Sequence, residues 1–153
     1  MTIPFTTNAT PIRLLLVEDG PGDVRLLQEA FKDTTLDLQV HVAHDGIDAM
    51  EFLLRQGKHA ASPRPNLILL DLNLPRKSGT AVLAEIKSHP SLKSIPVIVL
   101  SSSSSIEDVG RAYSLRANCY ISKPMELEGF LSVIQWIESF WLSTVSLPLG
   151  ELA

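Results

Sequence analysis

Four short apolar runs, each ending in a polar or charged residue, constrain the fold of this chain more than any other feature. The runs occupy 12–17, 67–70, 96–100 and 119–122, and they lead into Glu18-Asp19, Asp71, Ser101 and Lys123. Uninterrupted apolar runs are typical of parallel strands that are buried on both faces. Ligands of an open parallel sheet bind beyond the carboxyl ends of its strands. We therefore expect three acids, a hydroxyl and a cation in one crevice, a set suited to a divalent metal and a phosphoryl group.

Strand and helix patterns alternate along the chain, which predicts an α/β fold with one doubly wound, five-stranded parallel sheet and five helices. Residues 38–42 alternate as a further strand, and helical spacing recurs in the segments between the strands. We assign 12–142 to the folded domain, 1–11 to an N-terminal arm and 143–153 to a C-terminal tail.

Composition narrows the function classes. A chain of 153 residues is about one domain, and its net charge of −4 without a basic run argues against a nucleic-acid surface. The single cysteine, Cys119, allows no internal disulfide and fits a reducing compartment. The first eleven residues lack signal-peptide features, and Gln135 and Glu138 interrupt the last apolar stretch, so we expect a cytoplasmic protein without a membrane span.

The spacing of the motifs resembles that of response-regulator receiver domains, the CheY-like phosphoacceptors of two-component signalling, over about residues 12–140. The acid pair is followed by Asp71-Leu72-Asn73-Leu74-Pro75, and Gly79, Ser101 and Lys123-Pro124 come 8, 30 and 52 residues after Asp71. The resemblance implies a flavodoxin-like fold and a signalling module rather than an enzyme. Its phosphoryl group would come from a histidine kinase.

Three stretches resemble more narrowly the single-domain receivers that partner phytochrome-class histidine kinases: 72–77, 117–120 and 137–142. This likeness implies a phytochrome-class kinase as partner. It also implies output through protein contact, or relay to a downstream phosphotransfer protein, because no output domain follows. A homodimer through the fourth helix, fifth strand and fifth helix is implied as well.

The receiver resemblance assigns a role to each site residue. Asp71 is the phosphoacceptor, and Mg²⁺ is held by Asp19, Asp71 and the Asn73 backbone carbonyl, with Glu18 acting through water. Three acids in one cleft would repel one another and raise each other's pKa, so a cation is expected on physical grounds too. Mg²⁺ also spreads the charge of a phosphoryl transition state.

Lys123, Ser101 and Tyr120 complete the set that the resemblance assigns. Lys123 would pair with Asp71 and then with phosphoryl oxygens, aimed inward by a cis bond to Pro124, although trans is the ordinary expectation for such a bond. Ser101 would bind a phosphoryl oxygen and Tyr120 would be the aromatic switch; otherwise Tyr120 is a half-buried residue at a strand edge.

Other polar residues are expected to have structural roles rather than roles in the site. Asp23 and Asp45 are expected to cap helices or to be solvated, and one or more of Ser102–Ser105 to cap the next helix. The four histidines lie in different elements without metal-ligand spacing, so loop or solvated roles are expected. Gly20 replaces the asparagine or other polar residue common in near relatives, which bears on the stiffness of the metal loop.

Two alternative functions use a similar sheet. An aspartyl-phosphate phosphohydrolase commonly needs a second aspartate two residues after the nucleophile, where this chain has Asn73. A flavodoxin-like FMN carrier would need a Gly/Ser/Thr-rich phosphate loop after the first strand, where Glu18-Asp19 would repel phosphate.

The last helix is predicted to carry two apolar stripes. One should cover the sheet and comprises Leu127, Phe130, Leu131, Ile134, Ile137 and Trp141. The other comprises Val133, Trp136 and Phe140, and we expect it to form a homodimer interface because exposed aromatic patches usually mark one. The alternative is that the tail from 143 to 153 folds back over this second stripe.

Overall fold

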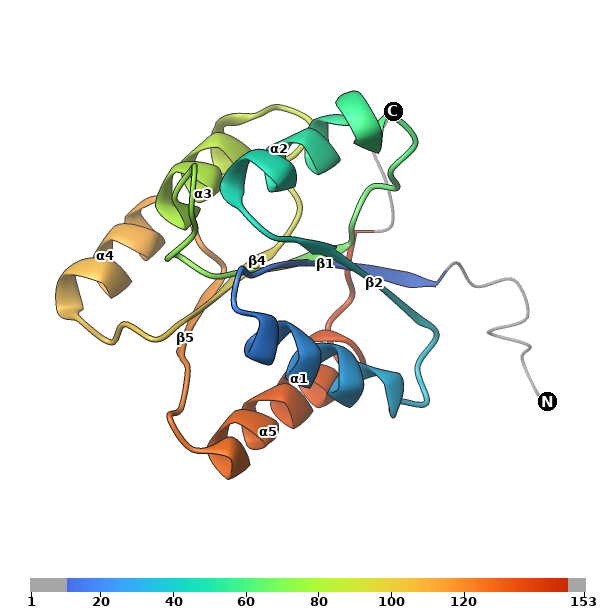
Figure 1. The fold of residues 1–153 in the computed structure, drawn as a ribbon, viewed down its shortest axis with the longest axis vertical. Coiled ribbons are helices and arrows are strands. Elements are labelled where there is room, and N and C mark those ends of the chain that lie inside the picture. The colour runs from blue at the N-terminus through green and yellow to red at the C-terminus, as the bar shows by residue number, and fades with distance from the viewer. Residues whose placement is uncertain (1–10, 149–153) are drawn as a thin grey trace.

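Five parallel strands form one sheet in the order β2-β1-β3-β4-β5 in this computed structural model, which describes residues 11–148 (Figure 1). The strands are β1 (Ile12–Val17), β2 (Leu38–Ala43), β3 (Leu67–Leu70), β4 (Val97–Ser101) and β5 (Cys119–Ser122). The order reverses between β1 and β3, and such a switch point opens a crevice at the carboxyl ends of the strands. The predicted doubly wound sheet is confirmed.

Helices cover both faces of this sheet (Figure 1). One face carries α1 (Pro21–Lys32) and α5 (Leu127–Trp136), and α5 continues into a π-helical turn, η2 (Ile137–Trp141). The other face carries α2 (Gly46–Leu54), α3 (Gly79–Ser88) and α4 (Ile106–Ser114), with a short 3-10 turn, η1 (Gly57–His59), after α2.

Two apolar cores explain why the central strands contain uninterrupted apolar runs. Leu15, Val17, Ile68 and Leu70 belong to the core beneath α2, α3 and α4. The alternate residues Leu14, Leu16, Leu67 and Leu69 belong to the core beneath α1 and α5. Successive side chains of a strand point to opposite faces, so the stretch of a strand that is buried on both faces, which in β1 starts after Arg13, has no place for a polar residue until it ends. This confines the charged groups to the edge of the sheet.

Side-chain caps fix the starts of the three helices on one face. Asp45, Ser78 and Ser105 accept hydrogen bonds from backbone N–H groups of the first turns of α2, α3 and α4, at 2.7, 3.1 and 3.1 Å. The expected capping roles of Asp45 and of the serine run are confirmed.

The apolar stripe of α5 that covers the sheet is narrower than predicted. Phe130, Ile134 and Ile137 are buried and Trp141 is half-buried, as expected. Leu127 and Leu131 were predicted in the same stripe but are exposed. Phe130, Ile134 and Ile137, spaced i, i+4 and i+7, already fill the contact between α5 and the sheet. Leu127 and Leu131 project from the neighbouring side of the helix and therefore lie at the edge of this contact.

Residues 143–148 turn back from the end of η2, where the Thr144 and Val145 N–H groups donate to the Phe140 carbonyl (3.1 and 2.8 Å), and then reach the amino end of β3. Leu147 packs against the core beneath α1 and α5. The buried Asn66 donates from Nδ2 to the Pro148 carbonyl (2.9 Å) and accepts from the Arg13 N–H (2.7 Å). Trp136 and Phe140 remain exposed, so residues 143–148 do not bury the second stripe as the alternative would require; 149–153 lie outside the described part of the chain.

Candidate functional site

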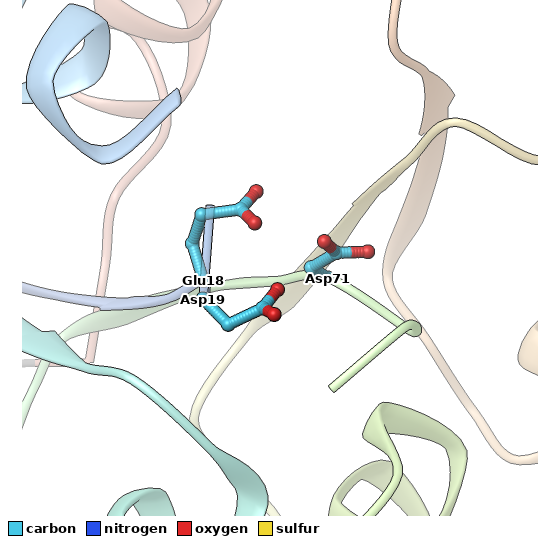
Figure 2. Close-up of side chains that lie close together, drawn as sticks. All are labelled: Glu18, Asp19 and Asp71. Atoms are coloured by element: carbon cyan, nitrogen blue, oxygen red, sulfur yellow. The ribbon is translucent and has the colours of Figure 1, made fainter. Parts of the chain in front are cut away.

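Three carboxylates converge at the carboxyl edge of the sheet (Figure 2). Glu18 and Asp19 directly follow β1, and Asp71 directly follows β3. The two strands are paired in register with Val17 opposite Leu70, so the residues that follow them stand side by side. One carboxylate oxygen from each acid lies within 4.8 Å of the others, close enough for a single cation to bind all three.

The acids differ sharply in burial. As whole residues, Glu18 and Asp71 are only 3% and 7% exposed, whereas Asp19 is exposed to solvent. A cation would thus enter past Asp19 and meet two desolvated carboxylates behind it. Oxygen-only ligands favour hard divalent cations such as Mg²⁺, Ca²⁺ and Mn²⁺. Within residues 11–148, no other cluster of three or more His, Cys, Asp or Glu side chains has such spacing.

Lys123 closes the site from the side of β5. Its Nζ donates to a Glu18 carboxylate oxygen, to Asp23 Oδ2 at 2.9 Å and to Asp71 Oδ2 at 3.3 Å. An ammonium group has three N–H donors, so all three are engaged. The Lys123 backbone N–H also donates to the Ser101 carbonyl (2.7 Å), which holds the chain after β5 against the end of β4.

Two expectations about this lysine need correction. Asp23 was expected to be a capping or solvated acid, but it pairs with Lys123. The first turn of α1 begins so soon after β1 that it stands beside the crevice, which places Asp23 within reach of Lys123. The receiver resemblance implied a cis bond between Lys123 and Pro124, but no peptide bond of residues 11–148 is cis.

Burial sets the direction of the pKa shift at Glu18, and ion pairing sets it at Lys123. Desolvation raises the pKa of Glu18 to about 7, and the neighbouring Asp71 adds to the effect while Lys123 opposes it. Burial also disfavours the charge on Lys123, but the hydrogen bonds that the ammonium donates to Glu18 and Asp23 outweigh it and raise the pKa of this lysine. The ammonium therefore stays charged, and a proton on Glu18 competes with a bound cation near neutral pH.

The Asp71 carboxylate is held by one contact on each oxygen. Oδ1 accepts from the Asn73 N–H at 3.1 Å, and Oδ2 accepts from Lys123. Gly79 packs directly against this segment: a Cβ there would lie 2.1 Å from the Asp71 carbonyl oxygen, so only glycine fits. This close packing holds the loop after Asp71 against the start of α3.

Ser101 and Tyr120 are linked through Ser103. Ser101 is fully buried at the end of β4, and its Oγ accepts from the Ser103 N–H at 3.4 Å. The half-buried Tyr120 packs against the core beneath α2, α3 and α4, and its hydroxyl donates to the Ser103 carbonyl at 2.8 Å. Sequence reasoning had assigned the serine run only to capping, so it missed Ser103 as the bridge between these two residues.

The histidines take no part in the acidic site, and two of them are less solvated than expected. His59 lies 2.7 Å from the Asp48 carboxylate, beside α2. His41 is half-buried in β2 next to Phe52, and burial lowers its pKa.

Response regulators are among the known proteins with similar sequences and structures. The response regulator receiver domain family matches residues 14–135. Response regulator Rcp1 of Synechocystis sp. is 53% identical over 138 residues, which cover 90% of this chain and 94% of that protein. The probable methanogenesis regulatory protein FilR2 of Methanothrix harundinacea is 37% identical over 133 residues, 86% of this chain and 84% of FilR2.

Two solved structures superpose closely, each with a TM-score of 0.88. The Mn²⁺-bound form of Rcp1 is 53% identical and covers 90% of this chain and 99% of its own. The phosphorylated cyanobacterial phytochrome response regulator RcpA is 48% identical and covers 91% of this chain and 99% of its own.

In residues 11–148, no helix is long and apolar enough to cross a membrane.

Proposed function

This chain belongs to the response regulator receiver domain family, and we propose that Asp71 is its phosphoacceptor and that Mg²⁺ is its metal. The observation that carries the proposal is the convergence of Glu18, Asp19, Asp71 and Lys123 at the switch point of the sheet. An Asp71 oxygen attacks the phosphorus of a kinase phosphohistidine. An O–P bond forms and makes Asp71 an acyl phosphate, the P–N bond breaks, and the histidine nitrogen takes up a proton from solvent.

We assign the metal ligands as Asp19, Asp71 and the Asn73 backbone carbonyl, with Glu18 acting through water. Mg²⁺ prefers oxygen ligands and usually keeps several waters, which suits a site with one exposed and two buried carboxylates. The Mn²⁺-bound structure of Rcp1 supports a divalent cation in a related protein. The cation supplies charge neutralisation as the anionic phosphoryl group approaches Asp71.

Lys123 and Ser101 then bind the phosphoryl oxygens in this proposal. Lys123 already donates to the Asp71 oxygen at 3.3 Å, so a short movement transfers that N–H to a phosphoryl oxygen. Ser101 gives up its weak 3.4 Å contact with the Ser103 N–H when its hydroxyl turns toward the phosphoryl group. That change alters the Ser103 loop, to which the Tyr120 hydroxyl is bonded, and Tyr120 becomes free to change its rotamer.

We propose a phytochrome-class histidine kinase as the upstream partner, and output through protein contact or relay to a downstream phosphotransfer protein. The similarity to RcpA over 91% of this chain supports the kinase class. The cytoplasm is the proposed place of action, which is compatible with Cys119 as a free thiol.

We further propose a homodimer built on exposed aromatic side chains of α5 and η2. Trp136 and Phe140 stack with ring centroids 5.3 Å apart and an interplanar angle of 11°, and they are 43% and 41% exposed. Val133 was predicted in the same stripe but is half-buried against the core. The proposed interface therefore centres on Trp136 and Phe140, and the exposed Ile106 and Tyr113 of α4 are candidates for its periphery.

The two alternative functions fit the site less well. Asn73 occupies the position where a phosphohydrolase of this chemistry commonly has its acid, and asparagine has no carboxyl group to act as acid or base. Glu18 occupies the start of the loop where a flavin phosphate would bind, and its carboxylate accepts the Gly20 N–H (3.1 Å) that a phosphate would need.

Phosphorylation by acetyl phosphate tests the proposal directly. Wild-type protein with Mg²⁺ should gain one phosphoryl group by intact mass, and Asp71→Asn should gain none. Asp37→Asn, which removes an exposed acid before β2, is the matched control and should behave as wild type. An adduct that persists in Asp71→Asn would overturn the assignment.

A second experiment tests the class of the kinase. Phosphoryl transfer to this protein should be faster from a phytochrome-class kinase than from an unrelated histidine kinase, and equal transfer rates would contradict the proposed partner.

A further inference from the structure

We propose that Asp23 is a positioning residue for phosphoryl transfer: together with Glu18 it anchors the Lys123 ammonium so that the third N–H points at Asp71. This inference rests on the proposed role of Asp71 as phosphoacceptor. The evidence is the arrangement of the lysine's three partners, their burial and the local structure that holds Asp23 in place.

The two anchors come from one short segment, while the lysine comes from the far end of the chain. Glu18 and Asp23 flank the turn between β1 and α1, and both accept from Lys123 Nζ. The Nζ–Asp23 distance is 2.9 Å and the Nζ–Asp71 distance is 3.3 Å, so Asp71 has the longer contact. The lysine is thus held mainly from the β1–α1 side and presents its remaining N–H to the reacting carboxylate.

The segment between the anchors is itself tightly held. The second oxygen of Glu18 accepts the Gly20 N–H at 3.1 Å, and the Val24 N–H donates to the Gly20 carbonyl at 2.9 Å. Pro21 occupies the first position of α1, where its fixed φ favours the helix. An acid in the first helical turn is also favourable, so one carboxylate serves both the helix and the lysine.

The exposed fractions of the side chains show that Asp23 shields the Lys123 ammonium group from solvent. The side chains of Glu18, Asp71 and Lys123 are 4%, 9% and 10% exposed, whereas that of Asp23 is 38% exposed. Asp23 therefore lies between the ammonium group and solvent. Without its carboxylate, that N–H would bond to water, and the flexible lysine side chain could swing out of the crevice.

The anchor matters most when the cation is bound. Glu18 and Asp71 then share their charge with the divalent ion, which weakens their hold on Lys123. Asp23 is the one partner of the lysine that we do not assign to the metal, so it keeps its full charge for the ion pair. Preorganised donors of this kind accelerate a reaction because they need no reorientation as charge develops.

A graded series of variants tests the inference. Asp23→Ala should lower the rate constant for phosphorylation of Asp71 by acetyl phosphate about fivefold, which corresponds to about 1 kcal/mol. Asp23→Asn keeps a neutral acceptor of the same shape and should fall between wild type and Asp23→Ala. Asp23→Glu restores a carboxylate that can reach Lys123 and should recover most of the rate. A purely structural role would change the melting temperature without this order of rates.

Glu29→Ala is the matched control, because Glu29 also lies on α1 but contacts only Lys32, at 3.6 Å, among ionised partners. It removes the same charge from the same helix and should phosphorylate at the wild-type rate. Mg²⁺ affinity, measured by calorimetry, should stay close to wild type in the whole Asp23 series. A large loss of Mg²⁺ affinity would overturn the inference, because Asp23 would then act through the metal.

The outcomes separate this inference from the function on which it rests. If wild-type protein takes up no phosphoryl group on Asp71, the proposed function fails and the inference fails with it. If wild type is phosphorylated and Asp23→Ala reacts equally fast or faster, only the positioning role of Asp23 is refuted. Asp23→Asn covers the case in which the alanine variant does not fold.

Discussion

Glu18 and Lys123, 105 residues apart in the chain, form a buried ion pair at the carboxyl edge of the sheet. Lys123 is also paired with Asp23 and Asp71, and Asp19 lies alongside, so one cation faces four acids. This imbalance leaves the crevice negative whenever the acids are ionised. It attracts a divalent cation and, without one, favours a proton on Glu18.

Removing divalent cations should therefore make stability depend on pH through Glu18. Burial raises the pKa of Glu18 from 4.5 to about 7, so the folded state binds a proton more tightly than the unfolded state. The resulting stabilisation is fully present below about pH 4.5 and is lost as the pH rises through about 7. Its size is on the order of 3 kcal/mol. Urea unfolding in a chelator between pH 5 and pH 8 should show the decline.

Glu18→Gln isolates this contribution, because glutamine does not titrate. The control is necessary since burial lowers the pKa of His41, and that shift makes stability rise with pH over part of the same range. The free energy of unfolding of wild type minus that of Glu18→Gln should fall as the pH rises. A difference that does not change with pH would contradict the assignment.

Mg²⁺ should bind more tightly to wild type as the pH rises through about 7, with proton release measurable in buffers of different ionisation enthalpy.

Asp19→Asn should weaken Mg²⁺ binding and suppress phosphorylation while leaving the fold intact. Asp19 is the exposed member of the three-acid cluster, so its loss removes a ligand without opening a cavity. We expect at least a tenfold loss of Mg²⁺ affinity, about 1.4 kcal/mol. Calorimetric titration measures it, and Asp33→Asn, an exposed acid at the end of α1, is the control. Unchanged Mg²⁺ affinity in Asp19→Asn would remove Asp19 from the metal site.

Gly20→Asn should stabilise the protein by about 0.5–1 kcal/mol. Gly20 is the N-cap of α1, has an ordinary φ of −73° and makes no side-chain cap. A Cβ there would meet Glu18 Oε2 at 3.5 Å and Asp23 Cβ at 4.0 Å, which are normal contacts. Asparagine would reduce the conformational entropy of the unfolded chain, and its side chain could cap the helix. Urea unfolding measures the gain; Gly79→Asn, which clashes with the Asp71 carbonyl, should instead fail to fold.

The sheet and most of the site could be predicted from sequence because both follow from local patterns. The fully buried stretches of parallel strands must be apolar, so each stretch ends at the next polar residue, as at Glu18 after residues 14–17 and at Asp71 after Leu67–Leu70. The topology of such a sheet then brings those ends together. Capping by Asp45 and Ser105 was predictable for the same reason, since a cap contacts only its own helix.

Contacts between distant elements could not be predicted in the same way. Whether Asp23 meets solvent or Lys123 depends on where the end of β5 lies relative to α1, and neither segment encodes that distance. Ser103 contacts Tyr120 through its backbone carbonyl, which leaves no trace in the side-chain pattern. The end of the described tail is held by a hydrogen bond from Asn66, a residue far away in sequence, and by the packing of Leu147 against the core.

Ser101→Ala should still accept a phosphoryl group but should transmit the signal poorly. Asp71, Lys123 and the metal ligands remain in place, whereas the hydroxyl that draws the Ser103 loop inward is lost. Tyr120→Phe removes the 2.8 Å bond to the Ser103 carbonyl and should loosen the aromatic ring without phosphorylation. Comparing NMR spectra with and without beryllofluoride measures the switch. If Ser101 and Tyr120 do not move in wild type when the analogue binds, the proposed coupling is wrong.

Trp136→Ala should shift the protein from dimer to monomer. The stacked Trp136 and Phe140 rings are partly exposed and are not buried by residues 143–148, so a second copy is the proposed partner for this surface. Truncating an aromatic anchor at the centre of an interface typically costs about 2 kcal/mol, which weakens dimerisation roughly 30-fold. Light scattering at tens of micromolar should report a dimer for wild type and for Met125→Ala, a fully exposed residue outside the stack. A monomeric wild-type mass, unaffected by Trp136→Ala, would refute the dimer and leave the aromatic pair as a docking surface for a different protein.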